Sequence, residues 1–141
     1  MIYEINEKVE GYMEKKIMIV DDEEDVLSSL KTVLEKNNYS VTAVESGKEC
    51  LKEIEKGFKG IILMDIMMPG MDGWETIRAI VDRGLMKGLC IEIITGKGTF
   101  DREKMFGLQT FVKDYHTKPI DIETLISSIK RCNMFYLTEI E

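Results

Sequence analysis

Hydrophobic and polar positions in this chain follow two alternating periods. Five short runs, most of them apolar along their length, are separated by segments in which apolar residues recur every three to four positions. The first pattern predicts strands and the second predicts amphipathic helices. Apolar strands that alternate with helices are typical of a parallel sheet covered on both faces. The predicted strands are residues 16–20, 40–44, 60–64, 90–94 and 113–117.

The predicted helices begin and end at recognisable signals. Ser46 precedes Glu49 by three positions and Asp72 precedes Glu75 by three, which is the spacing of a capping box. Five strands and five helices joined by right-handed crossovers predict an α/β three-layer sandwich with a parallel five-stranded sheet. The helical segments follow the first strand to residue 36, begin near residues 47 and 73, cover 102–111 more weakly, and begin again at 122.

Residues with reactive or metal-binding side chains occur where the predicted strands end. Asp21 and Asp22 follow the first strand, Asp65 follows the third, Thr95 the fourth and Lys118 the fifth. Because the carboxyl ends of parallel strands meet at one edge of a sheet, we expect these side chains to converge. Three carboxylates in one place repel one another unless a cation lies between them, and an oxygen-only site suits Mg²⁺.

This convergence predicts phosphoryl chemistry. A carboxylate such as Asp65 can attack phosphorus and form an aspartyl phosphate. Thr95 can donate its hydroxyl to a phosphoryl oxygen, and Lys118 can neutralise another. Each residue alone has a simpler interpretation as a helix cap, a turn residue or a solvated lysine, and the acidic run 21–25 suits a helix N-terminus. The joint pattern favours a site.

Composition restricts the classes of protein to which the chain can belong. A length of 141 residues suits one domain, and 44% hydrophobic with 32% charged residues suits a globular protein. The net charge of -7 argues against a nucleic-acid partner, and no apolar run approaches the roughly 18 residues of a membrane span. The three cysteines, Cys50, Cys90 and Cys132, lack metal-ligand spacing, so we expect reduced thiols in a cytoplasmic protein.

Four motifs in order give the chain a resemblance to a known family. They are the acidic pair at 19–22, Asp65 followed by the Met-Pro-Gly-Met-Asp-Gly run at 68–73, Ile-Thr-Gly at 94–96, and Tyr-His-Thr-Lys-Pro at 115–119. With these motifs the chain resembles the receiver domain of two-component response regulators. We expect the receiver to span residues 15–133, with an N-terminal extension at 1–14 and a C-terminal tail at 134–141.

The resemblance implies a fold and a set of roles. The fold is a flavodoxin-like (βα)5 arrangement with strand order 2-1-3-4-5. The function is that of a stand-alone response regulator that accepts a phosphoryl group from a histidine kinase on Asp65, then acts on a downstream protein target that the sequence does not identify. Self-phosphorylation and self-dephosphorylation with Mg²⁺ would make it a phosphoacceptor and not a conventional enzyme. The resemblance implies catalytic roles for Asp65, Thr95 and Lys118, and roles as switch residues for Thr95 and Tyr115. It implies that Asp22, Asp65 and the Met67 carbonyl bind Mg²⁺ directly and that Asp21 binds it through water. It also implies a cis peptide bond between Lys118 and Pro119.

The chain departs from the family pattern beside the expected phosphoryl site. Met67 and Lys97 stand there, and neither is a carboxylate that could orient an attacking water, so we expect slow loss of the phosphoryl group. The usual Gly-Ala pair after the fourth helix is replaced by residues 110–112, and the Gly-rich loop 98–101 is expected to be mobile. The sole histidine, His116, is expected to be structural or exposed, and Trp74 partly buried.

Several alternatives stay open. A haloacid-dehalogenase-type phosphatase also uses a strand-end Asp and magnesium, but it needs a second Asp where Met67 stands. A non-catalytic interaction module of receiver shape is harder to exclude, because an intact site does not prove its use. The resemblance leaves open a homodimer through the fourth helix, fifth strand and fifth helix. Residues 1–14 have the spacing of an amphipathic partner helix, with a frayed tail or a later start at Met13 as alternatives.

Overall fold

The computed structural model describes residues 16–96 and 101–132, in which five parallel strands form one sheet of order β2-β1-β3-β4-β5. The predicted fold and strand order are therefore confirmed. The strands are β1 (Lys16–Val20), β2 (Ser40–Val44), β3 (Gly60–Asp65), β4 (Leu89–Thr95) and β5 (Val112–Thr117). The helices are α2 (Glu24–Lys36), α3 (Gly47–Glu55), α4 (Gly73–Asp82), α5 (Arg102–Met105) and α6 (Ile122–Cys132), with a 3₁₀ turn η1 at Gln109–Phe111.

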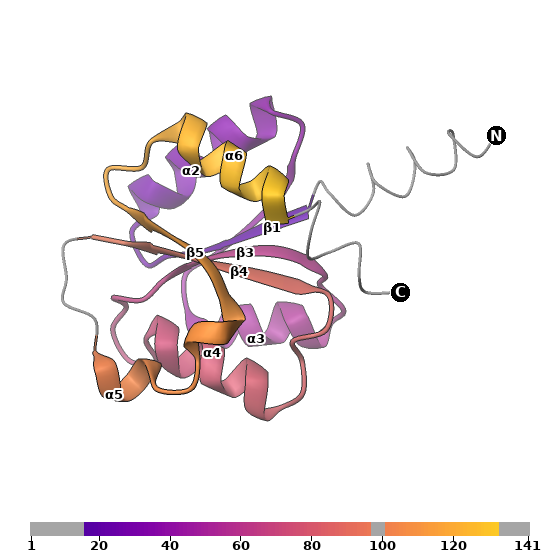
Figure 1. Ribbon diagram of the computed structural model, residues 1–141. Helices are drawn as coiled ribbons and strands as arrows, with labels where there is room; N and C mark the ends of the chain where they lie inside the picture. The colour runs from indigo at the N-terminus through magenta and orange to yellow at the C-terminus, as the bar shows by residue number, and fades with distance from the viewer. Residues whose placement is uncertain (1–15, 97–100, 133–141) are drawn as a thin grey trace.

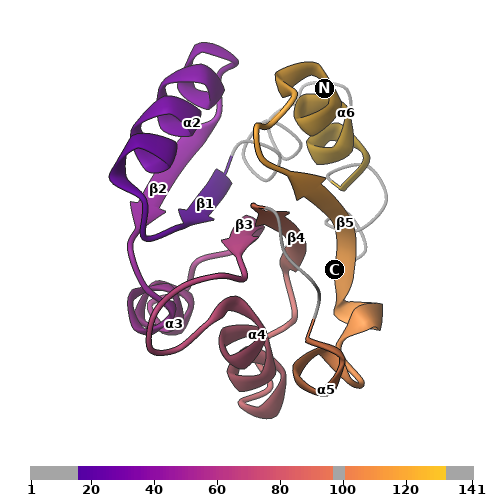
Figure 2. The same ribbon diagram turned by 90° about the vertical axis from the view of Figure 1, so that its left-hand side faces the viewer.

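The helices form a layer on each face of the sheet. Helices α2 and α6 cover one face, and α3, α4 and α5 cover the other (Figure 1). Figure 2 looks along the strands and shows their order from β2 at the left to β5 at the right, with a helical layer above and below. Each face has its own apolar core, so both layers are held by burial of hydrophobic surface.

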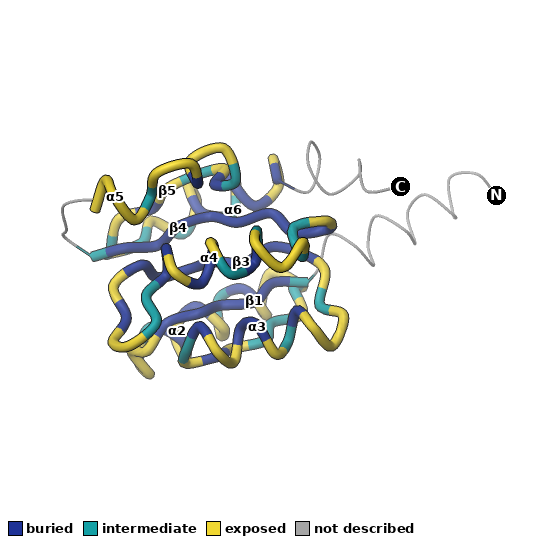
Figure 3. Tube along the Cα trace, turned by 90° about the horizontal axis from the view of Figure 1, so that it is seen from below, coloured by how far each residue is buried: buried dark blue, intermediate teal, exposed yellow. Residues whose placement is uncertain are grey.

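Alternation along the central strands explains why their sequences are continuously apolar. Ile17 and Ile19 of β1 pack under α2 and α6, whereas Met18 and Val20 pack against the opposite layer. Successive side chains of a strand point to opposite faces of the sheet, and here both faces are buried beneath helices. Figure 3 shows β1, β3 and β4 buried along almost their whole length, while the helices alternate between buried and exposed positions.

The predicted capping box is complete at α4 and only partly formed at α3. At α4, Asp72 Oδ1 accepts from the Glu75 N–H at 2.9 Å and Glu75 Oε1 accepts from the Asp72 N–H at 3.1 Å, which completes the capping box. At α3, Ser46 Oγ accepts from the Glu49 N–H at 3.1 Å. The Glu49 carboxylate accepts instead from the N–H of Glu45, so this box is only half formed.

Two structural expectations need correction. The weaker helix predicted over 102–111 is split, because the chain leaves α5 at Phe106 and Gly107 takes a positive φ of 77° that ends helical geometry before η1. Trp74 is only 2% exposed, not partly buried, since the first turn of α4 folds its indole into the core beside α3. Both differences arise from tertiary packing, which local periodicity does not report.

The expectation of three reduced thiols is also wrong, since Cys90 and Cys132 form a disulfide and only Cys50 is a free thiol. Cys90 lies on the side of β4 that faces α6, and Cys132 is the last residue of that helix. Packing of α6 on the sheet brings their Cα atoms to 6.3 Å, a separation that disulfides span. Because the two cysteines are 42 residues apart in the sequence, the sequence pattern does not indicate that they lie close together.

Some predictions fall on residues that the structure does not describe. These are the extension 1–14, the tail 134–141, Lys97 and most of the Gly-rich loop 98–101. The proposed domain boundaries therefore stay predictions. Within the described ranges, no helix combines the length and apolar character that crossing a bilayer requires.

Candidate functional site

Three carboxylates meet at the carboxyl edge of the sheet, as the strand ends predicted. Asp21 follows β1 and is fully buried, Asp65 ends β3 and is 1% exposed, and Asp22 is exposed at the rim. One oxygen from each of the three lies within 4.8 Å of the others. Parallel pairing of β1 with β3 accounts for this arrangement, because Val20 is in register with Met64, the residue before Asp65.

Lys118 is the cation that pairs with this pocket among residues 16–96 and 101–132. Its Nζ lies 2.8 Å from Asp21 Oδ2, 3.6 Å from Asp65 Oδ2 and 3.2 Å from Glu23 Oε1. Burial by itself would lower the pKa of this ammonium, but the hydrogen bond to Asp21 and the charge of Asp65 raise that pKa overall. Lys118 therefore stays charged and cancels part of the negative charge of the pocket.

The backbone positions Lys118 against the end of β4. The Lys118 N–H donates to the Thr95 carbonyl at 2.7 Å, which continues the β4–β5 pairing by one residue beyond Thr117. The Lys118–Pro119 peptide is cis, in agreement with the prediction. The chain then turns away toward α6, which leaves the ammonium directed at the two buried aspartates.

Asp65 has an unusual protonation equilibrium. Burial is the main cause that raises the pKa of this carboxyl from 3.8 to about 6. A hydrogen bond from the Met67 N–H to Oδ1 at 2.9 Å and the charge of Lys118 lower the pKa, whereas Asp21 and Asp22 raise it. The protein thus holds a carboxylate where it is poorly solvated and only partly neutralised, which is the environment of a reactive group or a cation ligand.

Thr95 supplies a buried hydroxyl at the end of β4. Its side chain is buried at the end of β4, and Oγ1 has no hydrogen-bond partner among residues 16–96 and 101–132. A buried hydroxyl without a partner costs stability, so its presence beside the carboxylates is suited to an added acceptor. An oxyanion in the pocket would be such an acceptor.

Tyr115, the other predicted switch residue, is not enclosed. It lies in register with Ile93, two residues before Thr95, so Tyr115 and Thr95 point to the same face of the sheet. The Tyr115 side chain is 39% exposed. The pair is thus on one face with Thr95 inside and Tyr115 at the surface.

Met67 lies in the loop that follows β3. Its side chain is 61% exposed, and its N–H is the donor to Asp65. This loop is held closely against the start of α4, since a Cβ on Gly73 would lie 2.5 Å from the Asp65 carbonyl oxygen. Only glycine permits that approach, so Gly73 fixes the path of the backbone beneath the carboxylates.

Sequence reasoning missed one residue of the pocket. Glu23 was assigned only to the acidic helix start, but its carboxylate pairs with Lys118 and its N–H donates to Asp21 Oδ1 at 2.8 Å. It is also the N-cap of α2. The acidic run after β1 indicates that a carboxylate could lie near Lys118, but nothing in the run distinguishes Glu23 from the other acids.

Comparison with known proteins assigns the family. Residues 17–130 match the response regulator receiver domain, so the chain belongs to this family. It is 45% identical to a CheY-like receiver domain protein from Methanospirillum hungatei, whose structure superposes with a TM-score of 0.81 over 86% of this chain and 96% of that one.

Two curated relatives differ in size from each other. The protein PilH of Pseudomonas aeruginosa is 32% identical over 114 residues, which are 81% of this chain and 93% of PilH. The transcriptional regulatory protein PhoP of Bacillus subtilis, named for alkaline phosphatase synthesis, is 34% identical over 118 residues. Those are 84% of this chain but only 48% of PhoP, so the chain spans about half the length of that relative.

The geometry of the pocket fits the family. The aspartate triad of Asp21, Asp22 and Asp65 is typical of the magnesium site of receivers. Its donors are all oxygen, one of its carboxylates is exposed to solvent, and the pKa of Asp65 is raised, so a hard divalent cation would relieve the repulsion among the three acids.

Proposed function

We propose that this protein is a response regulator receiver in which Asp65 accepts a phosphoryl group from a histidine kinase. The observation that carries the proposal is the placement of Asp65, a buried carboxylate with a raised pKa, between Lys118 and the acids Asp21 and Asp22. Membership of the receiver family gives the class of reaction. We further propose that the receiver spans residues 15–133 and works in the cytoplasm, with proteins and not nucleic acid or membrane as its partners.

The proposed reaction needs few parts. An oxygen of Asp65 attacks the phosphorus of a phosphohistidine, the P–N bond breaks, and a P–O bond to Asp65 forms. Lys118, 3.6 Å from Asp65 Oδ2, would pair with one phosphoryl oxygen, and the unpartnered Thr95 hydroxyl would donate to another. These two donors come from the ends of β4 and β5 and are held there by the Lys118 N–H bond to the Thr95 carbonyl.

Magnesium is the proposed cofactor. Asp22, Asp65 and the Met67 carbonyl would hold the ion directly, and Asp21 would hold it through water. When bound, the ion supplies positive charge that offsets repulsion between the carboxylates and the incoming phosphoryl oxygens. Lys118 alone cannot balance Asp21, Glu23 and Asp65, with which it already forms ion pairs.

An apolar groove beside the pocket suits the kinase. It has a volume of about 690 Å³ and runs between α2 and the segment after β5, and Glu23 and Lys118 are among its lining residues. A helix that carries the phosphohistidine could lie there with its imidazole directed at Asp65, because the groove and the pocket share those two residues. The apolar lining comes from Val26, Leu30, Val33, Pro119, Ile120 and Ile122.

Output would follow from a two-state switch at the other side of β5. Phosphorylation would draw the Thr95 hydroxyl toward the phosphoryl group, and Tyr115 would turn inward from its exposed position. The surface formed by α5, β5 and α6 would then change shape for a protein target or for a second copy of the chain. The absence of an acceptor for Thr95 Oγ1 among the described residues, and the shared face of Thr95 and Tyr115, support this proposal.

The test is incubation with Mg²⁺ and a small phosphodonor such as phosphoramidate, followed by intact-mass measurement. We expect the mass of one phosphoryl group to be added, in an acid-stable and base-labile form, and chelation of Mg²⁺ to prevent it. Val33→Asp should keep this reaction but lose transfer from a phosphorylated histidine kinase, because it alters the groove and not the pocket. A protein that gains no mass under any donor would instead be a non-catalytic interaction module.

A further inference from the structure

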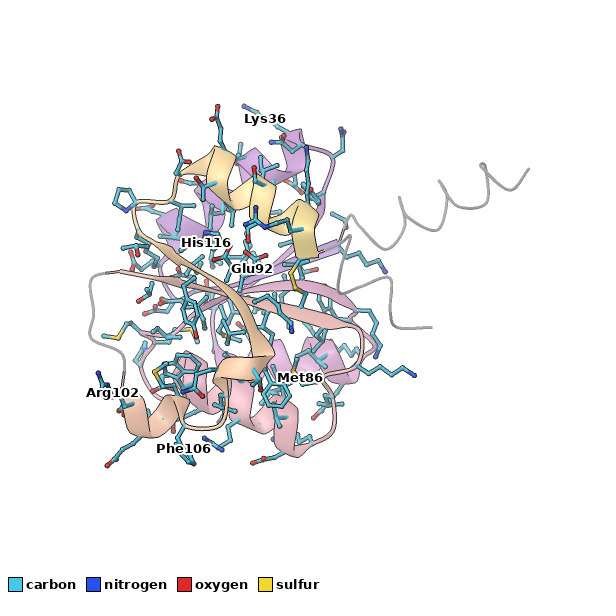
Figure 4. All side chains as sticks on the ribbon, viewed as in Figure 1. Lys36, Met86, Glu92, Arg102, Phe106 and His116 are labelled. Atoms are coloured by element: carbon cyan, nitrogen blue, oxygen red, sulfur yellow. A yellow bond between two sulfur atoms is a disulfide. The ribbon has the colours of Figure 1, made fainter. Side chains whose placement is uncertain are left out.

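A second group of buried polar residues lies away from the aspartate pocket, between β4, β5 and α6. Glu92 is fully buried in the middle of β4, and its Oε1 lies 2.6 Å from His116 Nε2 and 2.8 Å from Ser128 Oγ. Ser128 Oγ also lies 2.6 Å from Asp114 Oδ2, so its single proton is donated to one of these two carboxylates at a time. Figure 4 shows Glu92 and His116 directed toward one another, with the disulfide close by at the end of α6.

Strand and helix periodicity explain why these residues meet. Cys90 and Glu92 are two apart on β4 and share a face, and Asp114 is in register with Glu92 on β5. Ser128 and Cys132 are four apart on α6, so both point from the helix toward that face. The cluster is therefore a continuous polar seam beneath α6 inside an otherwise apolar core.

The seam contains a carboxylate oxygen without a partner. Glu92 Oε1 accepts from Ser128 and lies against His116, but Glu92 Oε2 is buried and has no hydrogen-bond partner in the part of the chain that the structure describes. A buried carboxylate oxygen without a partner carries an uncompensated desolvation cost, so a ligand for it would be stabilising. Glu92 offers an oxygen that lies within 4.8 Å of the sulfurs of Cys90 and Cys132.

We propose that Cys90, Glu92 and Cys132 bind one Zn²⁺ when the thiols are reduced, and that the disulfide is the oxidised, metal-free form of the same site. Two thiolates and one carboxylate are ligands that zinc accepts, with water in the fourth position of a tetrahedron. Hydrogen bonds from Ser128 and His116 to the other carboxylate oxygen would fix the orientation of Glu92, as outer partners commonly do for metal ligands. Magnesium would not compete, because it prefers oxygen ligands.

The disulfide form and the zinc-bound form can be interconverted by reduction and metal binding. A dithiol reductant breaks the Cys90–Cys132 bond by giving two electrons and two protons, and itself becomes a disulfide. Zinc then displaces the two thiol protons, and the two thiolates neutralise the charge of the ion. Tetrahedral Zn–S bonds of about 2.3 Å place two sulfurs about 3.8 Å apart, a separation that Cα atoms 6.3 Å apart accommodate.

This site is separate from the phosphoacceptor pocket and does not rest on the proposed function. Cys90 is five residues before Thr95 on β4, which corresponds to about 17 Å along an extended strand. The two sites also differ in chemistry, with oxygen ligands at one and sulfur ligands at the other. Both sites take residues from β4, and the residues Asp114 and His116 beside the proposed zinc site flank Tyr115 on β5.

Cobalt is a direct probe of the proposed site, because thiolate-bound Co²⁺ has charge-transfer absorption that oxygen-bound Co²⁺ lacks. We expect the full chain, reduced by a phosphine and desalted without oxygen, to bind one Co²⁺ with these bands and to lose them when Zn²⁺ is added. The oxidised protein should give none. Glu92→Gln should weaken binding by about tenfold or more, since even loss of an outer partner has an effect of this size.

Cysteine variants provide the decisive comparison, because the chain has three cysteines and all are described. Cys132→Ser should lose the bands, whereas Cys50→Ser should keep them, since Cys50 is buried in the core on the opposite face. Circular dichroism checks that each variant is folded. If Cys132→Ser does not fold, the proposal is tested by comparing Co²⁺ binding of the oxidised wild type, the reduced wild type and Glu92→Gln. No bands in the reduced wild type, or bands retained in folded Cys132→Ser, would overturn the proposal.

Discussion

Replacing Asp65 by asparagine should stabilise the metal-free protein at neutral and alkaline pH. The amide has nearly the same shape as the carboxylate but carries no charge, so the repulsion from Asp21 and Asp22 and the cost of burying an ion both disappear. The wild-type protein holds this carboxyl with a pKa of about 6, against 3.8 for an ordinary Asp. The charged form of Asp65 is therefore destabilised by the fold.

The size and sign of the effect follow from this pKa. Because the pKa is raised in the folded state, stability from this group is present in full below 3.8 and is lost as the pH rises through about 6. The pKa difference corresponds to about 3 kcal/mol at about pH 8, and to about 1 kcal/mol at about pH 4.5. The attraction between Asp65 and Lys118 is already included in this pKa, so we expect a gain of at most about 3 kcal/mol at the higher pH.

Urea unfolding with EDTA measures this difference directly. We expect Asp65→Asn to unfold at higher urea than wild type at about pH 8, and the gap to shrink toward about pH 4.5. Asp82→Asn is a matched control, because it removes one carboxylate at the exposed end of α4 and should change stability by no more than about 0.5 kcal/mol. The reasoning is refuted if Asp65→Asn is no more stable than wild type at pH 8, or if the gap does not depend on pH.

Three further predictions concern the metal, the switch and the lifetime of the phosphoryl group. Asp22→Asn should weaken Mg²⁺ binding, measured by calorimetry, more than Asp21→Asn does, because a direct ligand holds the ion more tightly than a water-bridged one; equal affinities would contradict the assignment. Thr95→Ala should still gain a phosphoryl group, yet lose the change in amide hydrogen exchange over α5, β5 and α6 that phosphorylation causes in wild type; an unchanged exchange response would argue against the switch. Met67→Asn should shorten the lifetime of the phosphorylated form by up to about 10²-fold, followed by mass after donor removal, because an amide can position water where the exposed thioether cannot; an unaltered decay would assign the lifetime to another residue.

The fold could be predicted from sequence because several local signals agreed. The apolar runs of β1, β3 and β4 are buried on both faces, so their composition alone identifies central strands of a parallel sheet. The positions of Asp21, Asp65, Thr95 and Lys118 at strand ends then followed from the topology. The helix at 102–111 could not be predicted as it stands, because its interruption depends on the backbone of Gly107.

The polar seam beneath α6 was not predicted for a different reason. Glu92 precedes His116 by 24 residues and Ser128 by 36, and no motif of the sequence links the three residues to one another. Their meeting depends on how α6 lies on the sheet, which pattern and propensity do not specify. For the same reason, the sequence does not indicate that Cys90 and Cys132 lie close together.

Borohydride trapping can show directly whether Asp65 alone accepts the phosphoryl group. Borohydride reduces an acyl phosphate to an alcohol, so a phosphorylated aspartate is converted to homoserine and can be located by peptide mass spectrometry. After treatment with Mg²⁺ and phosphoramidate, we expect homoserine at position 65 and at no other aspartate, and none in Asp65→Asn. Homoserine at Asp21 or Asp22, or labelling that persists in Asp65→Asn, would contradict it.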